Sequence, residues 1–135
     1  MPRLRTLSTT IRQHVSDERI ANLLCSALEG GSNYWYTIEA FAAPPALTFR
    51  TDETQVFKHI DYPMSEGGSI TIGDLEDSGA KFKHKILTRA VLRAGLQTMA
   101  EKYPSHYAEF VRENDDAETG DVFLQCCCFG EIIYG

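Results

Sequence analysis

The sequence lacks any apolar run that approaches the roughly 18 residues needed to cross a membrane. Its first fifteen residues, MPRLRTLSTTIRQHV, are basic and do not contain the apolar segment of a secretory signal peptide. These two absences predict a protein that has no membrane span and is located in the cytoplasm.

The four cysteines lack the C-x-x-C spacing of zinc knuckles and redox motifs. Cys25 stands alone, whereas Cys126, Cys127 and Cys128 are consecutive, and adjacent cysteines form only a strained disulfide. We therefore expect free apolar thiols in a reducing compartment.

Catalytic signatures such as G-x-S-x-G and H-E-x-x-H are also missing. The four histidines are scattered, and His59 near Asp61 is a weak acid–base pair. Because nothing supplies a nucleophile, an orienting base and an oxyanion site together, we expect a non-enzymatic protein without a cofactor. The oxygen-rich stretch NDDAETGD (114–121) lacks the order of an EF-hand, so we expect helix capping there rather than calcium or another metal.

The composition is that of a globular protein, with 135 residues, 43% hydrophobic and 24% charged. We divide the chain into a basic N-terminal arm, residues 1–14, and a single α+β domain, residues 15–135. The net charge of −6 disfavours direct DNA binding. It permits a nucleic-acid mimic that binds a basic protein.

Capping signals predict a first helix that begins after Ser16 and ends at Gly30 and Gly31 in the left-handed conformation. Its expected apolar face comprises Ile20, Leu23, Leu24, Ala27 and Leu28. A strand is expected over 33–41, with Tyr34 and Tyr36 on the core face and Trp35 on a half-open face.

Short strands are predicted at 47–50, 56–60 and 70–75. The two EGG sequences, 29–31 and 66–68, precede strands rather than helices, so we interpret them as turns and not as phosphate-binding loops.

A second long helix is predicted from Lys81 or Lys83 to Tyr103, followed by a short helix that begins at Pro104. The expected core face of the long helix is Ile86, Leu87, Ala90, Val91 and Ala94. Its second half is also apolar on the other side, through Leu92, Leu96 and Met99. This pattern predicts burial on all sides or a partner, and hence a homodimer or higher homo-oligomer.

The apolar run 122–129 is compatible with a buried strand or a buried helix. Thr119 as N-cap and Gly130 as C-cap favour a helix, which a closing strand over 132–134 would follow. Together the elements predict an α+β fold in which helices pack on one face of a small, largely antiparallel sheet.

Charge is segregated along the second half of the chain. Residues 81–102 are basic and residues 109–121 are acidic. Four cations recur every fourth residue: Lys81, Lys85, Arg89 and Arg93. On a helix they would form a stripe of mutually repelling charges. Either water, salt and the acidic segment 109–121 folding back, or an anionic ligand, would compensate these charges.

The candidate ligand site combines this stripe with an aromatic ring and an amide. Trp35 would stack on a base or sugar, while Arg89 and Arg93 would hold phosphate. Gln125 would contact the base or ribose. The alternatives are that Trp35 lies in the core or in a dimer interface and that Gln125 satisfies backbone groups. The complete candidate set is Trp35, Tyr36, Lys85, Arg89, Arg93 and Gln125.

Two segments, VSDERIANLLCSALEGGSNYWY (15–36) and NDDAETGDVFLQCCCFGEIIYG (114–135), resemble a family of small, mostly uncharacterised proteins of tailed phages and prophages. The resemblance identifies no catalytic or ligand-binding residue. It implies a small accessory phage protein, and many such proteins counter host immunity by sequestering nucleotide second messengers or by blocking a defence protein.

We therefore expect a phage accessory protein that sequesters a small anionic ligand, such as a nucleotide immune signal, in the cytoplasm of the infected host. The alternative is an acidic inhibitor that mimics nucleic acid and binds a host defence protein. A small hydrolase that depends on a metal ion or on His59 is the third hypothesis.

Overall fold

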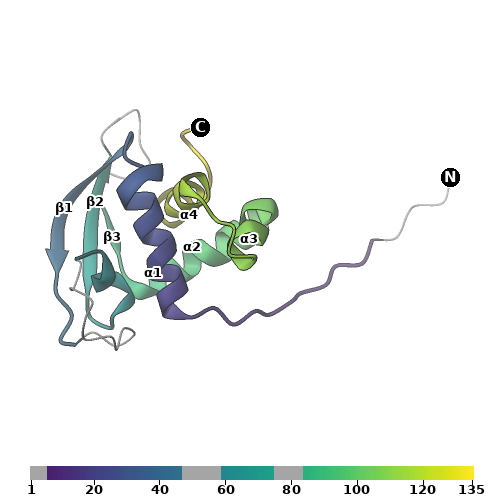
Figure 1. The fold of residues 1–135 in the computed structure, drawn as a ribbon, viewed down its shortest axis with the longest axis horizontal. Helices are drawn as coiled ribbons and strands as arrows, with labels where there is room; N and C mark the ends of the chain where they lie inside the picture. Colours follow the sequence, from purple (N-terminus) through teal and green to yellow (C-terminus); the bar gives the residue numbers. More distant parts are fainter. Residues whose placement is uncertain (1–5, 47–58, 75–83) are drawn as a thin grey trace.

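The computed structural model describes residues 6–46, 59–74 and 84–135. In these ranges, four α-helices lie on one side of a three-stranded antiparallel sheet (Figure 1), which confirms the predicted α+β class. The predicted strand at 47–50 lies outside the described residues. The last two residues of the predicted strand at 56–60 instead begin the 3-10 helix η2 (His59–Met64), and the rest of that strand is also outside.

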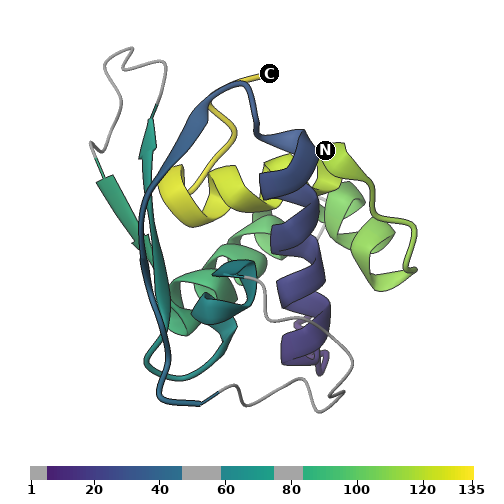
Figure 2. The ribbon, with the colours of Figure 1, turned by 60° about the vertical axis from the view of Figure 1, so that its left-hand side comes forward.

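The sheet has the order β1-β2-β3, with β2 (Ser69–Asp74) between β1 (Tyr36–Ala42) and β3 (His84–Leu87). The strand predicted at 70–75 is thus confirmed as β2. Ile70 and Ile72 of β2 are fully buried under the helices. A register shift between Ile38 and Ala40 interrupts the pairing of β1 with β2. Figure 2 shows that β1 is curved and lies at one edge of the sheet, and that the helices cover one face of the sheet.

Helix α1 (Asp17–Ser26) begins where the sequence predicts, because the Ser16 Oγ accepts a hydrogen bond from the Arg19 backbone N–H at 3.2 Å. The five residues of the predicted apolar face are buried, as expected. Its helical backbone ends at Gly31, as predicted, but the left-handed conformation expected for Gly30 and Gly31 is wrong. The chain continues as a π-helical turn, η1 (Ala27–Gly31), and the described glycines with positive φ are Gly67 and Gly130. Gly31 is required for close approach instead, since a Cβ there would lie 1.9 Å from the Ala117 carbonyl oxygen.

Helix α2 (Arg89–Lys102) starts later than predicted, because residues 84–87 form β3 and Thr88 is the N-cap. The predicted core face is right only in part: Leu87 is buried and Val91 packs against the core, but Ile86, Ala90 and Ala94 are exposed. Helix α2 is instead buried along Leu92, Gly95, Leu96 and Met99. This face packs against α4 in the same chain. The apolar second half of α2 therefore gives no support to a dimer.

Helices α3 (Pro104–Val111) and α4 (Ala117–Phe129) confirm the start at Pro104 and the helical interpretation of residues 122–129. The N-cap of α4 is Asp116 rather than Thr119, and Gly130 ends the helix with φ +76°, as predicted. The closing strand predicted at 132–134 is wrong, since those residues are in no strand of the described sheet.

Candidate functional site

The four spaced cations do not form one helical stripe. Arg89 and Arg93 lie in the first two turns of α2, while Lys85 lies in β3 and Lys81 is outside the described residues. Lys85 pairs with Ile72 across the sheet. Burial raises the pKa values of Cys127 and Cys128 in α4, and the charge of Lys85 opposes part of this rise. The repulsion expected along a single helix is thus reduced to the pair on α2.

Asp17, at the first turn of α1, pairs with both arginines of α2. Its Oδ2 accepts from Arg89 Nη2 at 2.8 Å, and its Oδ1 accepts from Arg93 Nη2 at 2.9 Å. Two guanidinium groups therefore share one carboxylate, and this cluster keeps an excess positive charge. Arg89 Nε is buried and forms no hydrogen bond within the described part of the chain.

The acidic segment 109–121 does not compensate Arg89 and Arg93 in the described contacts, and that predicted alternative is wrong. Asp115 and Glu113 pair with Arg19 at 3.7 and 3.5 Å. Asp116 caps α4, and Asp121 is buried in a hydrogen-bond network. Because so many of its carboxylates act within the fold, this segment gives the nucleic-acid mimic little support.

The stacking role predicted for Trp35 is wrong, because its side chain is 0% exposed. Its Nε1 donates to Asp121 Oδ1 at 2.8 Å, and its ring packs against Tyr134 and Phe129, with centroids 5.8 and 5.3 Å away. The expected alternation failed because residues 32–35 form a turn and β1 begins only at Tyr36. The core alternative for Trp35 is confirmed.

Tyr36 and Gln125 are likewise engaged inside the fold. The Tyr36 hydroxyl donates to the Leu28 carbonyl oxygen, and burial raises the pKa of that hydroxyl. Gln125 Oε1 accepts from the backbone N–H groups of Ile133 and Tyr134 at 2.7 and 2.8 Å. The alternative that Gln125 satisfies backbone groups is confirmed, and these bonds hold the C-terminal segment without a strand.

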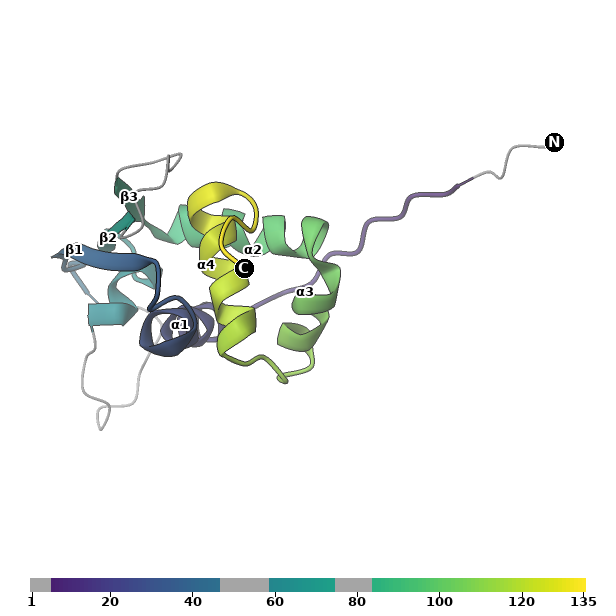
Figure 3. The same cartoon turned by 90° about the horizontal axis from the view of Figure 1, so that it is seen from above.

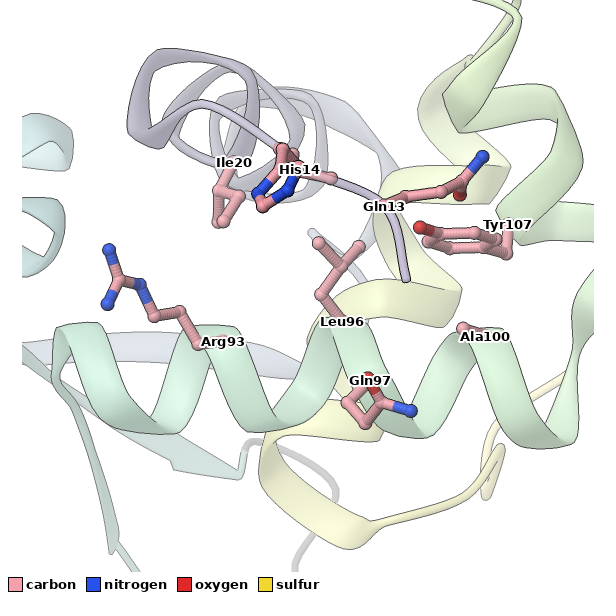
Figure 4. Close-up of a pocket in the computed structure, with 9 residues that line it drawn as sticks. Gln13, His14, Ile20, Arg93, Leu96, Gln97, Ala100 and Tyr107 are labelled. Carbon is pink, nitrogen blue, oxygen red and sulfur yellow. The ribbon is translucent and has the colours of Figure 1, made fainter. Parts of the chain in front are cut away.

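A cavity of about 280 Å³ lies where the N-terminal arm crosses α2 (Figure 4). Four elements line it: the end of the arm, α1, α2 and α3. We call it the α2 groove. Its lining residues are Gln13, His14, Val15, Ile20, Arg93, Leu96, Gln97, Ala100 and Tyr107. Arg93 stands at one end and the Tyr107 ring at the other, with Leu96 between them, so the groove has an apolar floor and a polar rim.

Further cavities share lining residues with this groove, and two of them extend along α2. One, of about 780 Å³, is lined by the arm from Thr9 to His14 and shares Gln97, Ala100 and Tyr107 with the groove. The other, of about 540 Å³, lies between the turn at 66–69 and the first turns of α2, and Arg93 lines it as well. Arg93 therefore separates two hollows on the surface.

Of the predicted site residues, only Arg93 lines the α2 groove. The sequence alone did not indicate Gln13, His14, Gln97 and Tyr107, which come from three separate segments. A partial signal was present: Arg93, Gln97 and Ala100 have the spacing that places them on one face of a helix.

Comparisons of the chain with protein-family models, with curated proteins and with solved structures found no match. Among the described residues, no helix is long and apolar enough to span a membrane. No group of three or more His, Cys, Asp or Glu side chains in those residues is placed to hold a metal ion.

Proposed function

We propose that the chain is a non-enzymatic protein that binds a small anionic ligand of the nucleotide class in the α2 groove. One observation carries the proposal: a guanidinium, an aromatic ring and two side-chain amides line the same cavity over an apolar floor. These are the three kinds of group by which proteins hold a phosphate, a base and a base edge.

Arg93 would hold the anionic group. Its side chain is 52% exposed, and one of its terminal nitrogens is engaged by Asp17. A guanidinium has five N–H donors in a fixed fork, so donors remain for a phosphate. Arg89 shares the same carboxylate, which leaves Arg93 only partly neutralised.

Tyr107 would take the stacking role first assigned to Trp35. A base stacked on an aromatic side chain contributes about 1–3 kcal/mol. Gln13 and Gln97 would contact hydrogen-bonding edges of the ligand. Gln97 Nε2 already donates to Glu101 at 2.9 Å, which restricts the orientation of its amide. The adjoining larger cavity would give room to the rest of a nucleotide.

Sequestration in an infected cell is the biological role that we propose for this binding. The resemblance of residues 15–36 and 114–135 to small phage proteins supports it, because many such proteins remove nucleotide signals of host immunity. Each copy would then act by holding its ligand in the host cytoplasm, and tight binding alone would suffice.

Isothermal titration calorimetry with mononucleotides, cyclic mono- and dinucleotides and ADP-ribose tests the proposal. We expect at least one of them to bind, and Arg93→Gln to raise its Kd about 10–100-fold through the loss of a charge-assisted contact of about 1.5–3 kcal/mol. Tyr107→Leu should also weaken binding. The matched control is Arg112→Gln, which removes an exposed arginine just after α3 and should leave Kd unchanged.

Two results would contradict the proposal. One is the absence of binding across the whole panel. The other is a ligand whose Kd is the same for the wild-type chain and Arg93→Gln. Chromatography of the mixture would show whether a bound compound is hydrolysed. If it is, the chain is an enzyme and not a binding protein.

A further inference from the structure

The N-terminal arm exposes two large apolar side chains. Residues 6–14 are extended and exposed, with Leu7 88% and Ile11 82% accessible. Residues 9–14 of the arm line cavities beside α2 and α3, and Figures 1 and 3 show the arm then running away from the domain. Burial of each such side chain would stabilise the protein by about 1.5–3 kcal/mol. A surface that covered both side chains would therefore gain this free energy.

The arm has the residue pattern of a β-strand. Leu7, Thr9 and Ile11 are two residues apart, so in an extended chain they share one face. Threonine and isoleucine are β-branched and favour strands. The arm therefore has the composition and the conformation of a strand that lacks a sheet within the described chain.

Strand β1 offers an edge of the appropriate length. It has seven residues, it pairs with β2 on one side, and no described strand pairs with its other side. Its last four residues are exposed. Phe41 is 42% exposed there and makes an edge-to-face contact with Tyr62, with centroids 6.3 Å apart. An edge strand of this kind is a template for an added strand.

We infer that the arm of one copy adds as a fourth strand to the β1 edge of a second copy, and that the exchange is reciprocal. Residues 6–14 would span about 30 Å as a strand, enough to follow the whole of β1. Leu7 and Ile11 would then cover the ring of Phe41, as cross-strand apolar pairs do. Reciprocal exchange closes a two-fold symmetric dimer.

Two features favour a second copy over the arm's own sheet. Figure 1 shows β1 and the arm on opposite sides of the domain, so the arm would have to reverse its direction to reach its own β1. Charge also favours association, because residues 1–14 carry three arginines and no acid while the whole chain carries −6. Gln13 and His14 lie at the end of this arm and also line the α2 groove, so the exchange would change that groove as well.

Light scattering coupled to size-exclusion chromatography tests the inference on the full chain. We expect a mass twice that of the monomer for the wild type, and the monomer mass for the double variant Leu7→Glu/Ile11→Glu. Both side chains are almost fully exposed, so these changes leave the folded domain intact. The control is Ile133→Glu, an exposed apolar residue elsewhere, which should remain dimeric.

Phe41→Glu tests the receiving edge, and circular dichroism confirms that it folds. It should give monomers too. In a mixed dimer of labelled and unlabelled chains, filtered NMR spectra should connect the methyl groups of Leu7 and Ile11 with the Phe41 ring of the other copy. A monomeric wild-type chain would overturn the inference, and so would a dimer that persists in the arm variant or that lacks these contacts.

Discussion

Replacement of Asp121 should be the most destabilising single change among the carboxylates described here. Its two oxygens accept four hydrogen bonds from other side chains. Oδ1 accepts from Ser32 Oγ at 2.7 Å and from Trp35 Nε1 at 2.8 Å. Oδ2 accepts from Tyr34 at 2.7 Å and from Gln125 Nε2 at 3.2 Å. One buried carboxylate thus joins the turn before β1 to the middle of α4.

The size of the effect follows from what Asp121→Ala leaves behind. Ser32 and Trp35 are fully buried, so their donors cannot turn to water. An unpaired buried donor costs about 1–3 kcal/mol. The Tyr34 hydroxyl is partly exposed and can be solvated, and Gln125 keeps its bond to the Tyr134 carbonyl oxygen at 2.9 Å. We therefore expect a loss of about 3–5 kcal/mol, a large part of the 5–15 kcal/mol that stabilises a typical domain.

Urea denaturation measures this loss, followed by circular dichroism and by the fluorescence of Trp35, the single tryptophan. The control is Asp116→Ala in the same helix. It removes the N-cap, which accepts from Thr119 N at 3.0 Å, and should cost about 1 kcal/mol. If Asp121→Ala destabilised the chain no more than this control, the hydrogen-bond network would not be what holds α4 to the turn before β1.

Three further predictions concern packing and proton binding. Gly95→Ala should lower the unfolding free energy by about 1–3 kcal/mol in urea denaturation, because its Cβ would lie 2.1 Å from the Cys127 Sγ and 2.9 Å from its Cα; an unchanged midpoint would contradict this. Burial and the Asp121 carboxylate raise the pKa of Tyr34 above its usual value of 10.0, so the folded state binds this proton more tightly. Stability should fall as pH rises above 10, and Tyr34→Phe should flatten that fall in denaturation curves measured at several pH values. Burial raises the pKa of Cys126 to about 11 and that of Cys128 to about 12, so both thiols should resist alkylation at pH 8 in the native protein and react in urea, as mass spectrometry would show.

Local capping signals explain which helix ends could be predicted. A capping residue affects only the backbone close to it, so it can be recognised without knowledge of the rest of the fold. Three helix ends lie where such residues predict them, at Ser16, Pro104 and Gly130. The start of α2 has a capping signal of the same kind, but the charge spacing around it favoured a longer helix. Lys85 and Arg89 are four residues apart, as on one helix, but Thr88 between them is an N-cap that separates a strand from a helix.

Which face of a helix or strand is buried was harder to predict, because it depends on residues that are distant in the sequence. Trp35 is buried because Asp121, 86 residues further along the chain, accepts its indole N–H. The α2 groove has the same character, since the arm, α2 and α3 each supply part of its lining. Arg93 was found because its charge is visible in the sequence, whereas Gln97 and Tyr107 are ordinary helix residues until the arm is placed beside them.

The two faces of helix α2 have different roles, one in the packing of the fold and one in the candidate site. Its Gly95 face packs on α4, while Arg93 and Gln97 are exposed beside the arm. The ion pair of Arg93 with Asp17 is half-exposed, and such pairs contribute only about 0.2–1 kcal/mol to stability. Arg93→Gln should therefore leave the domain folded, with a loss of stability of this small size. If the variant loses more binding free energy than this loss of unfolding free energy, the difference comes from a direct contact between Arg93 and the ligand. The same variant therefore tests whether the ligand binds in the α2 groove without disturbing the fold.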